Sequence, residues 1–104
     1  MIKESSFPSN PKEALKNGFT NAEKKFFDLC HNEHGIIDKS GSCAIVVLIV
    51  EDMCYVANVG DSRAVLAREV DGNIVGFPLN RDHKASEPDE EHRILKHGGR
   101  ISAF

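Results

Sequence analysis

Apolar residues recur with a helical period near the start of the chain. Residues 1–10 are polar and include a proline, so they predict a flexible leader. Asn10 has the position of an N-cap, followed by Pro11 and, three residues after the cap, by Glu13. The next apolar residues are three or four positions apart, with lysines and glutamates between them: Leu15, Phe19, Ala22, Phe26 and Leu29. This pattern predicts an amphipathic helix from Pro11 onward.

The pattern then changes to one that is typical of strands. Cys43–Val50 is apolar and rich in β-branched residues without alternation, which favours a strand covered on both faces. Asp71-Gly72 predicts a two-residue hairpin turn, and Gly76 and Pro78 predict a bulge or a sheet edge. Three more strands are expected after the first, so that four form an antiparallel meander: residues 53–59, 63–68 and 74–79.

A second helix and a further strand are expected after the meander. Ser86 has the spacing to Asp89 of a helix start, and Gly98-Gly99 suits a helix end. Ile101–Phe104 resembles the beginning of a strand. The predicted fold class is α+β, an antiparallel β-sheet meander with packed helices. One helix cannot cover both faces of Cys43–Val50, so we expect a missing partner layer or self-association of this chain.

Composition narrows the classes of partner. The chain has 104 residues and a net charge of −3, and it lacks a Lys/Arg run of the kind that binds nucleic acid. Its longest apolar run is far shorter than the ~20 residues that span a bilayer, and the first residues show no signal-peptide pattern. We therefore expect no nucleic-acid and no membrane partner. Three cysteines, an odd number, predict buried free thiols and a cytoplasmic protein, with the nucleus as an alternative location.

The segment Gly60–Arg63, which reads Gly-Asp-Ser-Arg, is the main candidate for chemistry. A carboxylate held on a tight turn between two strands is a suitable ligand for a hard divalent cation such as Mg²⁺, which takes only one or two carboxylates and keeps several waters. The alternative is that Asp61 and Ser62 only stabilise the turn by bonding nearby backbone amides. The pattern alone leaves both interpretations open.

Several blocks in consecutive order resemble those of the metal-dependent serine/threonine protein phosphatases of type 2C. The resemblance extends from Pro11 to Phe104, and the string from Ala57 to Arg63 with a Gly-Gly block downstream is its most specific part. The blocks are Ser40–Ala44, Val56–Leu66, Asp82–Lys84, Glu91–Ile94 and Gly98–Ile101.

The chain also departs from that family's pattern. Cys43 stands where the family usually has Thr, and Ala85 stands where Pro is common. The family's early Asp-Gly-His-Gly-Gly block and its later aspartate blocks, which supply most metal ligands, are absent. The chain therefore resembles a central fragment of the catalytic domain, over residues 11–104.

The resemblance implies a four-layer α/β/β/α sandwich and hydrolysis of phosphoserine and phosphothreonine in phosphoprotein substrates. It implies Mg²⁺ or Mn²⁺ as cofactor, with a metal-activated water as nucleophile. Asp61 alone matches a position near the metal centre, as a ligand of an accessory ion, and no catalytic residue is carried over. A fragment with so few ligands is expected to be inactive alone. The alternative function is a phosphatase-like regulatory or interaction module without catalysis.

Two further assignments concern the residues beside that turn. Asp82, His83 and Lys84 resemble the lead-in to the family's variable flap beside the active site. Their alternative role is a turn that anchors the second helix. Arg63 is interpreted as a structural strand residue rather than a phosphate clamp.

Overall fold

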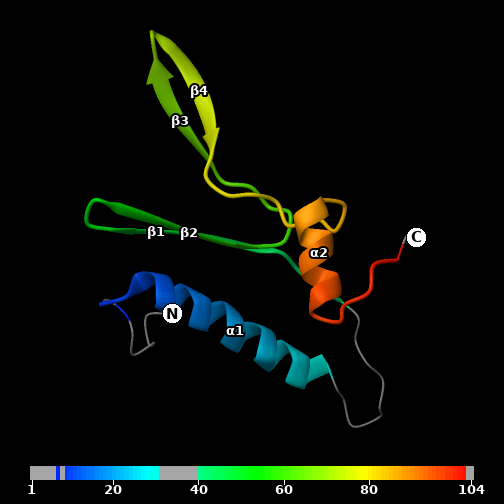
Figure 1. The fold of residues 1–104 in the computed structure, drawn as a ribbon. Helices are drawn as coiled ribbons and strands as arrows, with labels where there is room; N and C mark the ends of the chain where they lie inside the picture. The colour runs from blue at the N-terminus through cyan, green and yellow to red at the C-terminus, as the bar shows by residue number, and fades with distance from the viewer. Residues whose placement is uncertain (1–6, 8, 31–39, 103–104) are drawn as a thin grey trace. The chain divides into compact units, whose positions relative to one another are not determined.

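The computed structural model describes Phe7, residues 9–30 and residues 40–102. Two helices and four strands follow one another in these parts (Figure 1): α1 Pro11–Cys30, β1 Ala44–Val50, β2 Met53–Val59, β3 Val65–Val70, β4 Asn73–Pro78 and α2 Pro88–Lys96. The predicted α+β class with antiparallel strands is confirmed. Most of the predicted leader lies outside the described residues. Ile101 and Ser102 have no regular structure, and the rest of the strand predicted there is outside the described residues too.

Helix α1 begins as the sequence predicts. The backbone N–H of Glu13 donates to Asn10 Oδ1 at 3.1 Å, and the N–H of Ala14 donates to the Asn10 carbonyl at 3.0 Å. The Asn10 side chain thus satisfies a helix-start N–H that no helical carbonyl can reach. Of the predicted stripe, Leu15 alone is buried, whereas Phe26 is 46% and Leu29 80% exposed. The other buried residues of α1 lie outside the stripe: Pro11, Ala14 and Cys30.

The four strands form two separate sheets, each of two strands, β1 with β2 and β3 with β4. The predicted chain order is therefore kept, but the meander is divided between β2 and β3. The cause is local, because the backbone from Gly60 to Ala64 bonds to residues 79–83 and does not continue a strand ladder. The division matters because the Gly60–Arg63 segment lies in this interval.

The β3–β4 hairpin has a regular register. Val65 lies opposite Pro78 at one end and Val70 opposite Asn73 at the other, without interruption. The predicted bulge is therefore absent from this hairpin, and the edge alternative holds because both strands are edges. Asp71 and Gly72 have φ angles of 51° and 79°. Positive φ at both turn positions identifies the predicted hairpin turn as type I′, whose twist matches that of the strands.

Helix α2 begins later than predicted. Its N-cap is Glu87, which makes no side-chain capping bond, and its first residue is Pro88. Pro88 explains the shift from Ser86, because proline suits the first helical position, where its missing N–H is not needed. The predicted end at Gly98-Gly99 is confirmed. Gly98 has a φ of 78°, and the N–H groups of Gly98 and Gly99 donate to the carbonyls of Leu95 and Ile94 at 3.0 and 2.9 Å, which is a Schellman motif.

The chain divides into two units, each described here by itself. The first contains α1 and the tip of the β1–β2 hairpin, residues 48–57. The second contains the base of that hairpin, β3, β4 and α2. Within the described part of the second unit, Asp82 is the one buried residue, and every residue of β3 and β4 is exposed.

The thiols differ from expectation. All three cysteines are free, but only Cys30 is buried, while Cys43 and Cys54 are exposed. The prediction of buried strand thiols is therefore wrong for these two. Its premise was a strand covered on both faces, and every residue of β1 is exposed or only half-buried. In the described part of the chain, neither helix has the length and apolar character needed to cross a bilayer.

Candidate functional site

The turn after β2 depends on a glycine. Gly60 has a φ of 106°, in the region that side chains other than glycine rarely adopt. A Cβ atom placed on it would lie 2.7 Å from the Cβ of Cys43 and closer still to its Sγ. The Gly60 carbonyl accepts a hydrogen bond from Asn58 Nδ2 at 2.9 Å. Close approach to Cys43 and the backbone angle therefore both require glycine at this position.

Asp61 lies next on this turn and is exposed. The Cys43 thiol donates to its Oδ1 at 3.3 Å. An exposed carboxylate on a constrained turn suits a hydrated Mg²⁺ or Mn²⁺, which needs few protein oxygens. Among the described residues, no group of three or more His, Cys, Asp or Glu side chains could enclose a metal ion. Asp61 thus fits as one ligand of such an ion and does not complete a site with its described neighbours.

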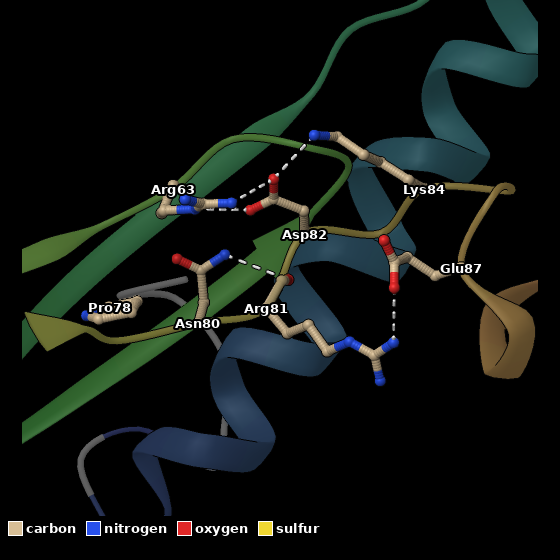
Figure 2. A pocket seen from close by; sticks show the side chains of 7 residues that line it. All are labelled: Arg63, Pro78, Asn80, Arg81, Asp82, Lys84 and Glu87. Atoms are coloured by element: carbon tan, nitrogen blue, oxygen red, sulfur yellow. Dashed lines mark hydrogen bonds and ion pairs between the residues drawn. The ribbon is translucent and has the colours of Figure 1, made fainter.

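Asp82 is bonded by two cationic side chains, Arg63 and Lys84. Arg63 donates from Nε to Asp82 Oδ1 at 3.0 Å and from Nη2 to Oδ2 at 2.8 Å, in a bidentate pair (Figure 2). Lys84 Nζ lies 3.1 Å from the same Oδ2. These donors, Arg63 first and then Lys84, lower the pKa of Asp82 to about 2. Asp82 is therefore ionised at neutral pH and its charge is compensated.

The position of Arg63 differs from the one predicted from the sequence. Arg63 precedes β3, which begins at Val65, so it is not a strand residue. Its structural role lies in the connection before the strand, where it faces Asp82. The pKa of Arg63 is raised further by that carboxylate. Its guanidinium is thus already paired in this arrangement.

Asn80 is a residue of the site that the sequence analysis missed. Its Nδ2 donates to the Ser62 carbonyl at 2.9 Å, and its Oδ1 accepts from the Ala64 N–H at 2.8 Å. One amide side chain therefore replaces a strand partner for two backbone groups. Its place two residues after the end of β4 was a weak signal, because a polar residue near a strand end is common and the sequence does not identify its partners.

The following residues connect this region to α2. Arg81 forms a bidentate ion pair with Asp89 in the first turn of the helix, and its Nη2 is 3.5 Å from Glu87 Oε2. Asp89 raises the pKa of Arg81, and Arg81 lowers that of Asp89. An open hollow of about 350 Å³ lies here (Figure 2), lined by Arg63, Pro78, Asn80, Arg81, Asp82, Lys84 and Glu87. Each cation of this described lining has a carboxylate partner, but Arg63 and Lys84 share Asp82. Three cations and two carboxylates give the lining a net charge of +1.

The two segments singled out in the sequence lie together. The His83 N–H donates to the Gly60 carbonyl at 3.0 Å, which joins the predicted flap segment to the turn that carries Asp61. The side chains have separate partners, because Asp61 bonds to Cys43 and Asp82 bonds to Arg63 and Lys84. His83 is exposed. Arg81, the residue before this segment, pairs with Asp89 of α2. The flap role and the anchoring role of residues 82–84 both stay predictions.

Comparison with known proteins identifies the lineage. The family model described as Protein phosphatase 2C matches residues 1–104. The chain is 37% identical to probable protein phosphatase 2C 71 of Arabidopsis thaliana, over 95% of this chain and 21% of that protein. It is 35% identical to probable protein phosphatase 2C 44 of Oryza sativa subsp. japonica, over 100% of this chain and 30% of the relative. It is 42% identical to protein phosphatase 2C homolog 3 of Schizosaccharomyces pombe, over 83% of this chain and 19% of that protein.

No solved structure matches the chain. The chain spans less than a third of the length of the curated relatives it matches, between 14% and 30%. Because the family model covers every residue from 1 to 104, the chain belongs to the protein phosphatase 2C family.

Proposed function

We propose that this chain is a central part of the catalytic domain of a metal-dependent protein phosphatase that hydrolyses phosphoserine and phosphothreonine in proteins. The observation that carries the proposal is the family match over residues 1–104, joined to relatives that are three to seven times longer than the matched stretch. The exposed carboxylate of Asp61 supports it, because the turn presents an oxygen ligand where a hydrated cation can reach it.

In this proposal Asp61 is a ligand of an accessory Mg²⁺ or Mn²⁺. A bound divalent ion of this kind lowers the pKa of its water and neutralises phosphate charge. The described residues contain no group of three or more metal-binding side chains, and the proposal assigns the remaining ligands to the rest of the complete protein. Asp82–Lys84 leads into the flap, and Arg63 and Lys84 hold Asp82 in place. The chain alone is then inactive. The three free cysteines favour a reducing compartment, the cytoplasm or the nucleus.

The test compares this chain with the complete protein that contains it. Both are assayed for phosphate release from a phosphoserine and a phosphothreonine peptide with Mg²⁺ or Mn²⁺ at millimolar order. The complete protein is expected to turn over both peptides and to lose activity in EDTA, while the chain alone releases nothing. A folded complete protein that is inert with either ion would contradict the proposal and favour the regulatory module. Metal-dependent turnover by the 104-residue chain would contradict its proposed inactivity.

A further inference from the structure

The turn that carries Asp61 is fastened on both sides to residues 79–83. On one side, the Gly60 carbonyl accepts from the His83 N–H at 3.0 Å. On the other side, Ser62 and Ala64 bond to the Asn80 side chain at 2.9 and 2.8 Å. We call this set of bonds, together with the Arg63–Asp82 pair, the clamp.

Asp61 itself is the residue of this turn whose side chain bonds elsewhere. Its Oδ1 accepts from Cys43 at 3.3 Å, at the base of the β1–β2 hairpin. A thiol is a weak donor, so this contact alone fixes the carboxylate poorly. The direction in which Asp61 points is therefore determined mainly by the backbone on either side of it, which the clamp holds.

We propose that Asn80 and Asp82 are positioning residues for Asp61, and that they make the turn and the lead-in to the flap move as one body. The inference rests on the proposed function, in which Asp61 binds an accessory ion. Asn80 acts through the backbone of Ser62 and Ala64, and Asp82 acts through the guanidinium of Arg63, two residues after Asp61. Neither side chain has to touch the ion.

The chemistry of the bonds indicates what each residue contributes. Replacement of Asn80 by Ala leaves the Ser62 carbonyl and the Ala64 N–H without their partner, and an unmade bond of this kind costs more than the bond's net value. The Arg63–Asp82 pair is bidentate and charge-assisted, which fixes orientation as well as distance. Asp82 is only 9% exposed, so water competes poorly for its oxygens. A displacement of residues 82–84 is thus transmitted to the turn.

The first experiment measures how strongly the clamp protects the backbone of the turn, in the complete protein without metal. Amide hydrogen exchange of residues 60–64 is compared in Asn80→Ala, Asp82→Asn and the parent. Exchange at Ala64 is expected to rise about tenfold in Asn80→Ala, as loss of one hydrogen bond implies, with a smaller rise in Asp82→Asn. Asn73→Ala and Glu90→Gln are matched controls, because they remove an amide bond and an ion pair elsewhere in the chain. Unchanged exchange in both clamp variants would overturn the inference.

The second experiment measures ion binding. Mn²⁺ binding is followed by electron paramagnetic resonance without substrate, beside the Mn²⁺ dependence and the substrate KM of phosphate release. Asn80→Ala is expected to weaken binding of the accessory ion about 10- to 100-fold, as is usual when a residue that orients a metal ligand is lost. The substrate KM is expected to stay unchanged. Asn80→Asp keeps the oxygen that accepts from the Ala64 N–H. Its affinity for Mn²⁺ is therefore expected to lie between those of Asn80→Ala and the parent. It replaces Asn80→Ala in the experiment if Asn80→Ala does not fold.

The outcomes separate the inference from the proposed function. If Asp61→Ala weakens the ion but the clamp variants bind it normally, the clamp is only structural and the inference is wrong. If Asp61→Ala leaves every bound ion unchanged while turnover remains, the role of Asp61 and the inference both fail, although the phosphatase assignment stands. If the complete protein shows no metal-dependent turnover, the proposed function fails first.

Discussion

Among single residues, Asp82 combines low exposure with full charge compensation. It is 9% exposed and bonded to Arg63 and Lys84. Cations that bond to an ionised carboxylate stabilise its charged form and oppose the effect of burial. The folded chain therefore binds the proton at Asp82 more weakly than an unfolded chain does.

This difference makes stability depend on acid pH. The folded pKa of about 2 lies below the ordinary value of 3.8, so the stabilisation by ionised Asp82 is fully present above about pH 4 and is lost as pH falls toward 2. Urea unfolding is measured from pH 2 to 6 for the parent and for Asp82→Asn. The difference between their free energies of unfolding is expected to be largest above about pH 4 and to shrink as the pH falls toward 2. Arg63→Gln is expected to raise the pKa of Asp82 toward its ordinary value in a carboxyl ¹³C titration, and Lys96→Gln is the control. A pH-independent gap would contradict the assignment.

Gly60 is expected to be intolerant of any side chain. Gly60→Ala imposes both a φ of 106° and a collision with Cys43, which together are expected to cost about 1–3 kcal/mol or more of unfolding free energy. Gly41→Ala is the matched control, since a Cβ there meets nothing within 4 Å, and it is expected to stay within about 0.5 kcal/mol. Chemical denaturation measures both.

A second substitution separates the two causes. Cys43→Gly in the Gly60→Ala background removes the side chain that the new Cβ would meet and leaves the backbone strain in place. We expect partial recovery, with strong non-additivity between the two positions. Simple additivity would show that contact with Cys43 is irrelevant.

At the scale of elements, the β3–β4 hairpin is apolar on both faces. Cross-strand register places Val65 and Ile74 on one face, 59% and 82% exposed, and Leu66 and Phe77 on the other, 45% and 38% exposed. Arg68 covers part of the second face, with its guanidinium 5.5 Å from the centre of the Phe77 ring. Two-stranded hairpins are marginally stable alone, so this one needs a further layer.

We therefore expect the isolated chain to self-associate. Edge strands with exposed apolar side chains are templates for pairing with another chain. Analytical ultracentrifugation is expected to give an apparent mass that rises with protein concentration. The double variant Val65→Thr with Ile74→Thr is expected to show a smaller rise. Asn73→Thr, on the same hairpin, is the control because it leaves the apolar side chains in place. A monodisperse monomer that unfolds cooperatively would contradict this prediction.

The elements themselves were largely predictable, since local chemistry specifies them. Asn10 caps α1, Asp71-Gly72 makes the hairpin turn, and Gly98-Gly99 ends α2. Burial was less predictable, because it depends on layers that the pattern of one segment does not reveal. The apolar run of β1 indicated cover on both faces, yet every residue of β1 is exposed or half-buried.

At the scale of the whole molecule, the family assignment and the site came from different kinds of information. The order of short blocks was enough for the family, and the family match over residues 1–104 confirms it. The contacts within the site were not readable in advance, because they join residues far apart in the chain. Asn80 bonds to Ser62 and Ala64 across the whole β3–β4 hairpin. The metal role of Asp61 and the flap role of Asp82–Lys84 stay predictions.

The two ends of the β3–β4 hairpin are joined to each other by a backbone hydrogen bond. The Leu79 N–H donates to the Ala64 carbonyl at 2.9 Å, so its two ends are pinned side by side next to the clamp. Loop-closure entropy grows slowly with length, and exposed loop tips are where insertions are best tolerated. The Asp71-Gly72 tip is therefore an engineering point. A fluorescent or affinity tag inserted there is expected to leave the bond between Leu79 and Ala64 and the clamp in place, because the tip lies at the opposite end of the hairpin from them.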